Sequence, residues 1–290
     1  MSQVPEEIAV RLKTCAGFSS LPPVAMTLIE LARNAEIVLD SVADILGGEP
    51  AIAGQVMCIA NSELYARRRR SSNLRQALIV LGLSATLTLA LGFTLVATLR
   101  KRPTKGFDFD AYWRRALVAA TWGKLLSGEL GRRDTEEIFL GCLLQDIGML
   151  AIDEIAPEVY DGIDPFRLNH GRISQHERTQ IDTDHRAIGS WMLENWNMPD
   201  NLVQAVSHSH DLTAAGVDAE HKSYVRAIAM SGELADLWVG NPDEVSIHRA
   251  GQEAHRHLGI LPNRLAEMFD IIREQLPVAE SIFELSLIHI

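Results

Sequence analysis

One apolar stretch constrains the fold of this chain more than any other feature. From Ile138 to Ile152 almost every residue is apolar, and a single carboxylate, Asp146, lies inside the run. Such continuous apolar character predicts a buried helix that passes through the middle of an all-helical core. A carboxylate buried there must be paired, protonated or bound to a metal ion, because leaving it bare costs several kcal/mol. The sequence therefore predicts an interior built around Asp146 and one of these partners.

The rest of the chain is also predicted to be helical. Apolar residues recur at helical spacing and no segment alternates with a period of two, so we expect an all-α fold of two packed helical bundles with almost no sheet. The best linker is Lys101–Gly106, which is charged and contains both Pro and Gly. The expected helices are residues 24–34, 41–46, 51–60, 74–81, 111–130, 136–152, 155–161, 173–179, 185–195, 201–207, 223–238, 248–258 and 261–275.

Charge and cysteine content argue against several classes of protein. The net charge of −11 disfavours nucleic acid as a partner, since the phosphate backbone attracts basic surfaces. Cys15, Cys58 and Cys142 lie in apolar helical contexts without a CxxC pair. This predicts reduced thiols packed as small hydrophobic groups, and neither disulfides nor a zinc site. The first residues contain no apolar signal segment, so we expect a cytoplasmic protein.

One uncharged segment has two interpretations. Residues 76–99 lack any charged side chain and pass the length test of roughly 20 residues for a membrane span. Against a span, Gly82 and Ser84 predict the end of one helix and the start of another, and four threonines make the segment less apolar. Arginines flank both ends, so the charges give no orientation. We expect two short helices in a soluble core and no membrane association, with a span as the alternative.

A series of short motifs, from about Phe18 to Thr213, resembles the HDOD domain, the HD-related output domain of bacterial signalling proteins. In order they are Leu21-Pro22-Pro23-Val24, Glu49-Pro50-Ala51-Ile52, Ile59-Ala60-Asn61-Ser62, Gln76–Gly82, Tyr112–Arg115, Gly141–Gly148, Asp184–Gly189, Trp196–Pro199 and Ala205–His210. The resemblance implies an N-terminal helix in residues 1–17 and an HDOD domain in residues 18–213. That domain would divide into a first bundle, 18–105, and an HD-like part, 106–213, which residues 214–290 complete.

The resemblance also implies a fold related to HD-domain phosphohydrolases, used in signalling and mostly without catalysis. Active HD relatives hold metal ions with a His on an early helix, an adjacent His-Asp pair, further histidines and a late Asp. Such ligands suit hydrolysis because the metal lowers the pKa of a bound water. The matching positions in this chain are Arg115, Gln145, Asp146, His185, Ser209-His210 and the region Ser231-Gly232-Glu233, with Asp236 one turn further on.

The replaced ligands change the chemistry expected of that site. A glutamine amide such as that of Gln145 is a poor ligand for first-row metals, and a guanidinium cannot ligate at all. Arg115 also brings a fixed positive charge and can bond a carboxylate through two nitrogen atoms. We therefore expect Arg115 to pair with Asp146 and to fill the metal position, with no bound metal or other cofactor. We expect His185, His208 and His210 to have structural, hydrogen-bonded roles, and the alternative is remnant metal binding, with Asp146, His185 and His210 as the weak candidates.

Two polar groups in the first half are candidates for contact with a ligand or partner. One is the run of adjacent arginines Arg67, Arg68, Arg69 and Arg70. It would dock a nucleotide, an acidic partner or membrane lipid, or else form a solvated loop. The other is Asn61-Ser62, which follows a predicted helix. This pair has either a functional role in the family or a structural role as the cap or turn that ends the helix.

Three functions remain open from the sequence. We expect a non-catalytic bacterial signalling protein that acts through contacts with signalling proteins or through a small ligand. A receptor for a nucleotide such as a cyclic dinucleotide is one alternative, and a residual metal-dependent phosphohydrolase is another. No nucleophile-base pair, Gly-rich phosphate loop or DNA-reading motif supports a further class.

Overall fold

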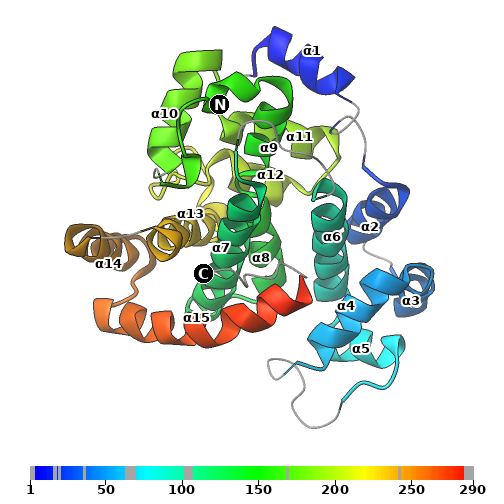
Figure 1. The fold of residues 1–290 in the computed structure, drawn as a ribbon. Helices are drawn as coiled ribbons and strands as arrows, with labels where there is room; N and C mark the ends of the chain where they lie inside the picture. Colours follow the sequence, from blue (N-terminus) through cyan, green and yellow to red (C-terminus); the bar gives the residue numbers. More distant parts are fainter. Residues whose placement is uncertain are drawn as a thin grey trace. The chain divides into compact units, whose positions relative to one another are not determined.

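The computed structural model describes residues 4–15, 18, 21–34, 37–62, 70–100, 107–167, 170–240 and 243–283. Every regular element in these ranges is helical, which confirms the all-α fold (Figure 1). The described residues form two compact units. Unit 1 contains residues 107–279 together with the segment up to Phe18, and unit 2 contains residues 21–100 and 280–283.

Unit 2 consists of short helices whose starts follow from the sequence. Proline occupies the first turn of two of them, where its missing N–H is not needed. Asn73 caps a third helix by accepting a hydrogen bond from the Gln76 N–H at 3.0 Å. The helices are α2 (Pro23–Arg33), α3 (Leu39–Gly47), α4 (Pro50–Ala60), α5 (Leu74–Leu81) and α6 (Leu83–Leu99).

The uncharged segment of unit 2 forms two helices, as expected. Gly82 separates α5 from α6 and has a φ of 84°, a conformation that glycine adopts without strain. The two helices are bent by 111° at this break. Among the described helices none is by itself long and apolar enough to cross a membrane, and this bent pair passes that test only when its two parts are taken together.

Unit 1 contains the stretch that the sequence placed in the core. Helix α7 packs against both α8 and α13, while α11 packs against α9 and α12 (Figure 1). The elements are α1 (Glu6–Thr14), α7 (Phe109–Glu129), α8 (Thr135–Leu144), α9 (Ile147–Ile155), η1 (Pro157–Tyr160), η2 (Pro165–Arg167), α10 (His170–Ile181), α11 (His185–Asn195), α12 (Asp200–Ser207), α13 (Ala219–Val239), α14 (Glu244–Leu258) and α15 (Pro262–Ile282), whose last residues belong to unit 2.

Aspartates start three helices of unit 1. Asp108, Asp184 and Asp243 precede α7, α11 and α14, and each side chain accepts a hydrogen bond from the N–H three residues further on, at 2.7–3.0 Å. This satisfies a donor that has no partner inside the helix. Helix α14 ends at Leu258, and the next residue, Gly259, has the left-handed backbone that is typical of a helix C-terminus.

The predicted core helix is broken, and the break lies at the buried carboxylate. The sequence predicted one helix over residues 136–152, but α8 ends at Leu144 and α9 begins at Ile147. Gln145 and Asp146 form the turn between them. Apolar spacing could not reveal this turn, because every residue from Ile138 to Asp153 is buried and neither helix has a polar face. The turn places Asp146 at the start of α9.

Two smaller expectations are also wrong. Residues 157–160 form a 3-10 turn, η1, where the sequence predicted a helix over 155–161. Cys58 is exposed, although we expected a packed thiol, because it lies off the α4 face formed by Ile52, Val56 and Ile59. The three cysteines are free, and burial raises the pKa of Cys142 to about 12, which keeps that thiol unreactive.

Candidate functional site

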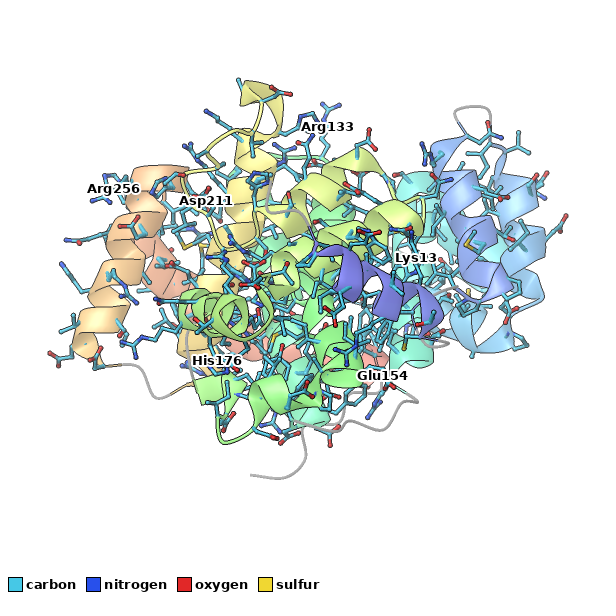
Figure 2. All side chains as sticks on the ribbon, turned by 90° about the horizontal axis from the view of Figure 1, so that it is seen from above. Lys13, Arg133, Glu154, His176, Asp211 and Arg256 are labelled. Carbon is cyan, nitrogen blue, oxygen red and sulfur yellow. The ribbon has the colours of Figure 1, made fainter. Side chains whose placement is uncertain are left out.

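A cluster of buried polar side chains surrounds Asp146 in unit 1. Charged side chains such as Lys13, Arg133 and Arg256 are exposed on this unit (Figure 2), whereas Asp146 is 3% exposed. The two oxygens of its carboxylate have different partners. We use the name arginine side for the group next to Oδ2, which consists of Arg115, His170 and Asp236. We use the name histidine side for the group next to Oδ1, which consists of His185 and His210.

Arg115 joins two carboxylates on the arginine side. It lies on α7 and is 1% exposed; its Nη1 donates to Asp146 Oδ2 and its Nε donates to Asp236 Oδ1 at 2.7 Å. Its Nη2 donates to the Gly232 carbonyl oxygen at 3.2 Å. A Cβ at Gly232 would lie 2.6 Å from Gln145 Oε1, so glycine allows α13 to approach this closely. The predicted pairing of Arg115 with Asp146 is confirmed.

His170 completes the arginine side from the start of α10. Its Nδ1 lies 3.0 and 3.2 Å from the two oxygens of Asp236, and its Nε2 lies 3.5 Å from Asp146 Oδ2. The imidazole and the guanidinium of Arg115 therefore stand between the same two carboxylates. His170 is 3% exposed, so neither contact is weakened much by water.

Positive charge keeps the carboxylates of Asp146 and Asp236 ionised. Burial by itself would raise the pKa of Asp146 and of Asp236, but Arg115 and His170 outweigh it and hold both pKa values below the usual range. Burial would likewise lower the pKa of Arg115, and the two carboxylates raise it instead. The arginine side is thus a guanidinium held between two anions.

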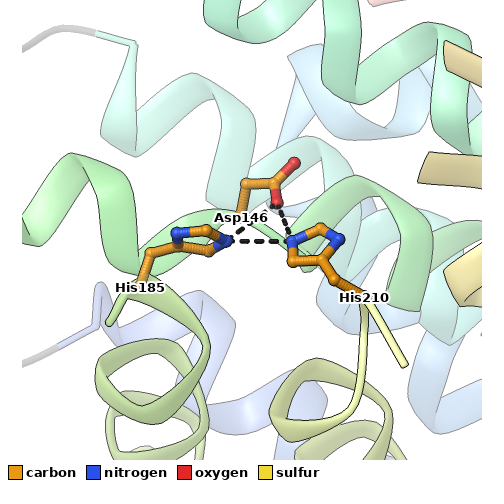
Figure 3. Close-up of side chains that lie close together, drawn as sticks. All are labelled: Asp146, His185 and His210. Atoms are coloured by element: carbon orange, nitrogen blue, oxygen red, sulfur yellow. Dashed lines mark hydrogen bonds and ion pairs between the residues drawn. The ribbon is translucent and has the colours of Figure 1, made fainter. Parts of the chain in front are cut away.

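On the histidine side three atoms converge (Figure 3). His210 Nε2 lies 3.0 Å from Asp146 Oδ1 and 2.9 Å from His185 Nε2, and His185 Nε2 lies 3.6 Å from Asp146 Oδ1. His185 is the first residue of α11, and His210 lies in the turn after α12. Gly148 lets α9 and α11 approach, because a Cβ there would lie 2.0 Å from the His185 carbonyl oxygen.

Glu177 orients His185 from α10. Its Oε2 lies 2.6 Å from His185 Nδ1 and accepts from the His185 N–H at 2.9 Å, while its Oε1 accepts from the Tyr160 hydroxyl at 2.7 Å. Burial would lower the pKa of His185, but Glu177 and Asp146 raise it. Burial lowers the pKa of His210 to about 3, although Asp146 opposes this shift. Of the two imidazoles, His210 is therefore the neutral one.

A metal ion fits the residues of one side only. Asp146 Oδ1, His185 Nε2 and His210 Nε2 form a group that could hold an ion, and nitrogen and carboxylate oxygen are ligands of first-row metals. On the arginine side the guanidinium of Arg115 has no lone pair and is bonded to Oδ2. The cluster therefore fits a mononuclear site on the histidine side and does not fit a second ion on the arginine side.

The structure places the other predicted residues differently. Gln145 is buried beside the cluster, but its amide nitrogen donates to the Cys142 carbonyl oxygen at 3.0 Å instead of facing Asp146. Asn61 bonds both backbone groups of Ser71, at 2.7 and 3.1 Å, and Ser62 donates to the Ile59 carbonyl oxygen at 2.7 Å. These contacts match the helix-end interpretation of the pair. The run of arginines is described only at its last member, Arg70, which is exposed; Arg67, Arg68 and Arg69 lie outside the described residues.

Sequence reasoning missed His170 and Glu177 and left Asp236 open. The available signal was spacing, because His170, Ile173, Ser174 and Glu177 recur at helical intervals and are the buried residues of α10. Three of these four side chains are polar, so the inward face of α10 has no apolar stripe that would mark it. Asp236 lies one helical turn beyond Ser231-Gly232-Glu233, and the structure brings its carboxylate to Arg115.

Comparison with known proteins assigns the family. Residues 18–212 match the family model described as the HDOD domain. The chain belongs to the HDOD family. A crystal structure of an HDOD domain protein of unknown function from Geobacter sulfurreducens has 21% sequence identity and a TM-score of 0.73, over 97% of this chain and 100% of that chain. The resemblance seen in the sequence motifs is confirmed.

Two further solved structures have the same fold. A proposed phosphohydrolase from Shewanella amazonensis SB2B has 18% identity and a TM-score of 0.72, over 97% of this chain and 98% of that chain. A proposed signal transduction protein from Marinobacter aquaeolei VT8 has 21% identity and a TM-score of 0.67, over 97% of this chain and 65% of that chain. A comparison with curated proteins finds no match. Similarity at these identities establishes the fold of this HDOD protein, and its chemistry must be argued from its own residues.

Proposed function

We propose that this HDOD protein is a bacterial signalling protein that does not catalyse a reaction and acts through a partner protein or a small ligand. The observation that carries the proposal is the position of Arg115. Its buried guanidinium is bonded to both Asp146 and Asp236. In a hydrolytic metal site these carboxylates would be free to hold a metal ion and its water. Here the guanidinium of Arg115 is already bonded to both.

A guanidinium cannot replace a metal ion in hydrolysis. A guanidinium has no empty orbital that can accept a lone pair, so it does not coordinate a water molecule. It therefore cannot lower the pKa of a water molecule toward neutrality as a metal ion does. A two-metal hydrolase also needs two ions about 3.5–4 Å apart, one on each side of the reacting phosphoryl group. Arg115 is bonded to Asp146 Oδ2 and to Asp236 Oδ1, so these two oxygens are already engaged where a second ion would need them. This supports a protein that retains the HD-like fold for a regulatory role and not for catalysis.

A hydrolysis assay tests the proposal. The purified protein, supplied in turn with Mn²⁺, Fe²⁺ and Zn²⁺, is incubated with p-nitrophenyl phosphate, bis(p-nitrophenyl) phosphate and a cyclic dinucleotide. We expect no turnover above that of the Asp146→Ala variant with any of them. Turnover by the unchanged protein that Asp146→Ala abolishes would overturn the proposal. The Asp211→Ala variant, which changes a partly exposed carboxylate close to His210, controls for a general loss of charge.

The second candidate is a residual metal-dependent phosphohydrolase. It is favoured by the three converging atoms of the histidine side and by the description of the Shewanella amazonensis SB2B protein as a proposed phosphohydrolase. A nucleotide receptor, the remaining alternative, depends on the arginine run, of which only exposed Arg70 is described. The same hydrolysis assay separates the phosphohydrolase from the signalling protein, because only the former shows turnover that depends on Asp146.

A further inference from the structure

We infer that the histidine side binds one divalent first-row metal ion through Asp146 Oδ1, His185 Nε2 and His210 Nε2, while Arg115 takes the place of a second cation. This inference deepens the proposed function and rests on it in one respect, which is that the ion is bound and not used for hydrolysis. It differs from the expectation of no metal. That expectation rested on the replaced ligands Arg115 and Gln145, and the sequence did not show on which side of Asp146 they would lie.

The distances on the histidine side match those between ligands of one ion. Ligand atoms about 2.1 Å from a metal lie about 3.0 Å apart in octahedral geometry and about 3.4 Å apart in tetrahedral geometry. The three separations among Asp146 Oδ1, His185 Nε2 and His210 Nε2 are 2.9, 3.0 and 3.6 Å. The side chains come from three different elements, the α8–α9 turn, α11 and the turn after α12. The fold thus brings them to ligand spacing without a shared local motif.

The orientation of the two imidazoles suits a shared ion. Nδ1 of His185 lies on Glu177 Oε2, so its Nε2 is the ring nitrogen turned toward Asp146 Oδ1 and His210 Nε2. Nε2 of His210 in turn faces both of these atoms within 3.0 Å. A metal ion placed among the three atoms accepts an electron pair from each.

The support around His185 is that of a metal ligand. A ligating imidazole usually donates its second N–H to a carboxylate, which fixes the tautomer and the ring orientation. Glu177 does this for His185 at 2.6 Å, and the Tyr160 hydroxyl holds the other oxygen of Glu177 at 2.7 Å. His185 and Glu177 are both fully buried. These contacts account for the burial of the Glu177 carboxylate.

The test measures metal bound per chain, with Zn²⁺ and Mn²⁺ alone as probes. The full-length protein is stripped with a chelator, its fold is checked by circular dichroism, and each metal is titrated by calorimetry and counted by mass spectrometry. We expect one ion per chain, a rise in melting temperature on binding, and a loss of affinity of about 100-fold or more in the His210→Ala variant. The His208→Ala variant is the matched control, since His208 lies two residues away and bonds Ser207 and Gln204 instead of the cluster. It should bind like the unchanged protein.

Two results would overturn the inference. One is the absence of a bound ion at metal concentrations well above those in cells, and the other is equal affinity in the unchanged protein and in His210→Ala. As a measurement that does not depend on stability, the visible spectrum of bound Co²⁺ should change in His210→Ala and stay unchanged in His208→Ala. The outcomes separate the two proposals. An ion that supports hydrolysis overturns the proposed function and keeps the site, whereas no ion and no hydrolysis keeps the function and removes the site.

Discussion

The two oxygens of the Asp146 carboxylate have different neighbours. Oδ2 faces a fixed cation, Arg115, which a second carboxylate, Asp236, holds in place. Oδ1 faces two imidazole nitrogens, Nε2 of His185 and Nε2 of His210. The arginine side is held together by an arginine and two carboxylates, while the histidine side groups atoms that are typical metal ligands. On our proposal, the replaced ligand Arg115 closes one half of the site and leaves the other half able to bind a metal ion.

The largest expected effect comes from removing the cation of the arginine side. The Arg115→Met variant keeps the length of the side chain but leaves Asp146 and Asp236 buried without their main partner. Loss of one member of a buried ion pair costs about 3–5 kcal/mol, and we expect a decrease of this size in the free energy of unfolding in urea.

The Arg273→Met variant is the control for that change. Arg273 forms an ion pair with Asp270 on α15, where the two side chains are 70% and 74% exposed. Exposed pairs contribute little, so a change within about 0.5 kcal/mol is expected. If Arg115→Met were as mild as Arg273→Met, the arginine side would not be the stabilising half of the cluster.

A smaller effect is expected from Asp236→Asn, which keeps the shape of the arginine side and removes one charge. The loss should be about 1–3 kcal/mol at neutral pH, as for hydrogen bonds to charged groups. The pKa of Asp236 is lowered in the folded state. Its contribution is therefore present above the unfolded pKa of about 4 and is lost as the pH falls below that value.

Urea unfolding between pH 6 and pH 3 checks the sign of this pH dependence. The unchanged protein should lose stability as the pH falls below about 4, and Asp236→Asn should lose less over the same interval. Equal slopes for the two proteins would show that Arg115 and His170 do not depress the pKa of Asp236.

The smallest effect is expected on the histidine side, from Tyr160→Phe. This change removes the hydroxyl that donates to Glu177 and should cost about 1 kcal/mol of stability. Because Glu177 orients His185, the affinity for a divalent ion should also fall by about tenfold. Tyr224→Phe removes another buried hydroxyl, which donates to the Glu137 carbonyl oxygen at 3.3 Å. It should affect stability alone, and an equal loss of metal affinity in both variants would contradict the orienting role of Glu177.

The helices of unit 1 were predictable where apolar and polar faces alternate. Helix α11 begins at His185 and ends at Asn195, as the sequence predicted. The turn at Gln145–Asp146 was not predictable, because burial on all sides removes the contrast on which periodicity depends. Helix α10 presented the opposite difficulty, since its inward face carries His170, Ser174 and Glu177 and looks like a surface.

One contact of the site was predictable from the sequence, but the arrangement of the whole cluster was not. The ion pair of Asp146 with Arg115 was predictable because the HDOD resemblance aligned Arg115 with a metal-ligand position, and a guanidinium there can only pair with the buried carboxylate. The sequence could not show that Gln145 turns back to its own helix, or that Asp236 and His170 reach the same guanidinium and carboxylate. These positions are far apart along the chain, and only the packing of α7, α10 and α13 brings them together.

Anomalous diffraction from crystals grown with Zn²⁺, recorded at the zinc edge, tests the central claim most directly. We predict one anomalous peak per chain at the cluster, within bonding distance of Asp146 Oδ1, His185 Nε2 and His210 Nε2, with the Arg115 guanidinium still on Oδ2. A peak on the arginine side with Arg115 displaced, or two peaks that flank Asp146, would contradict the account.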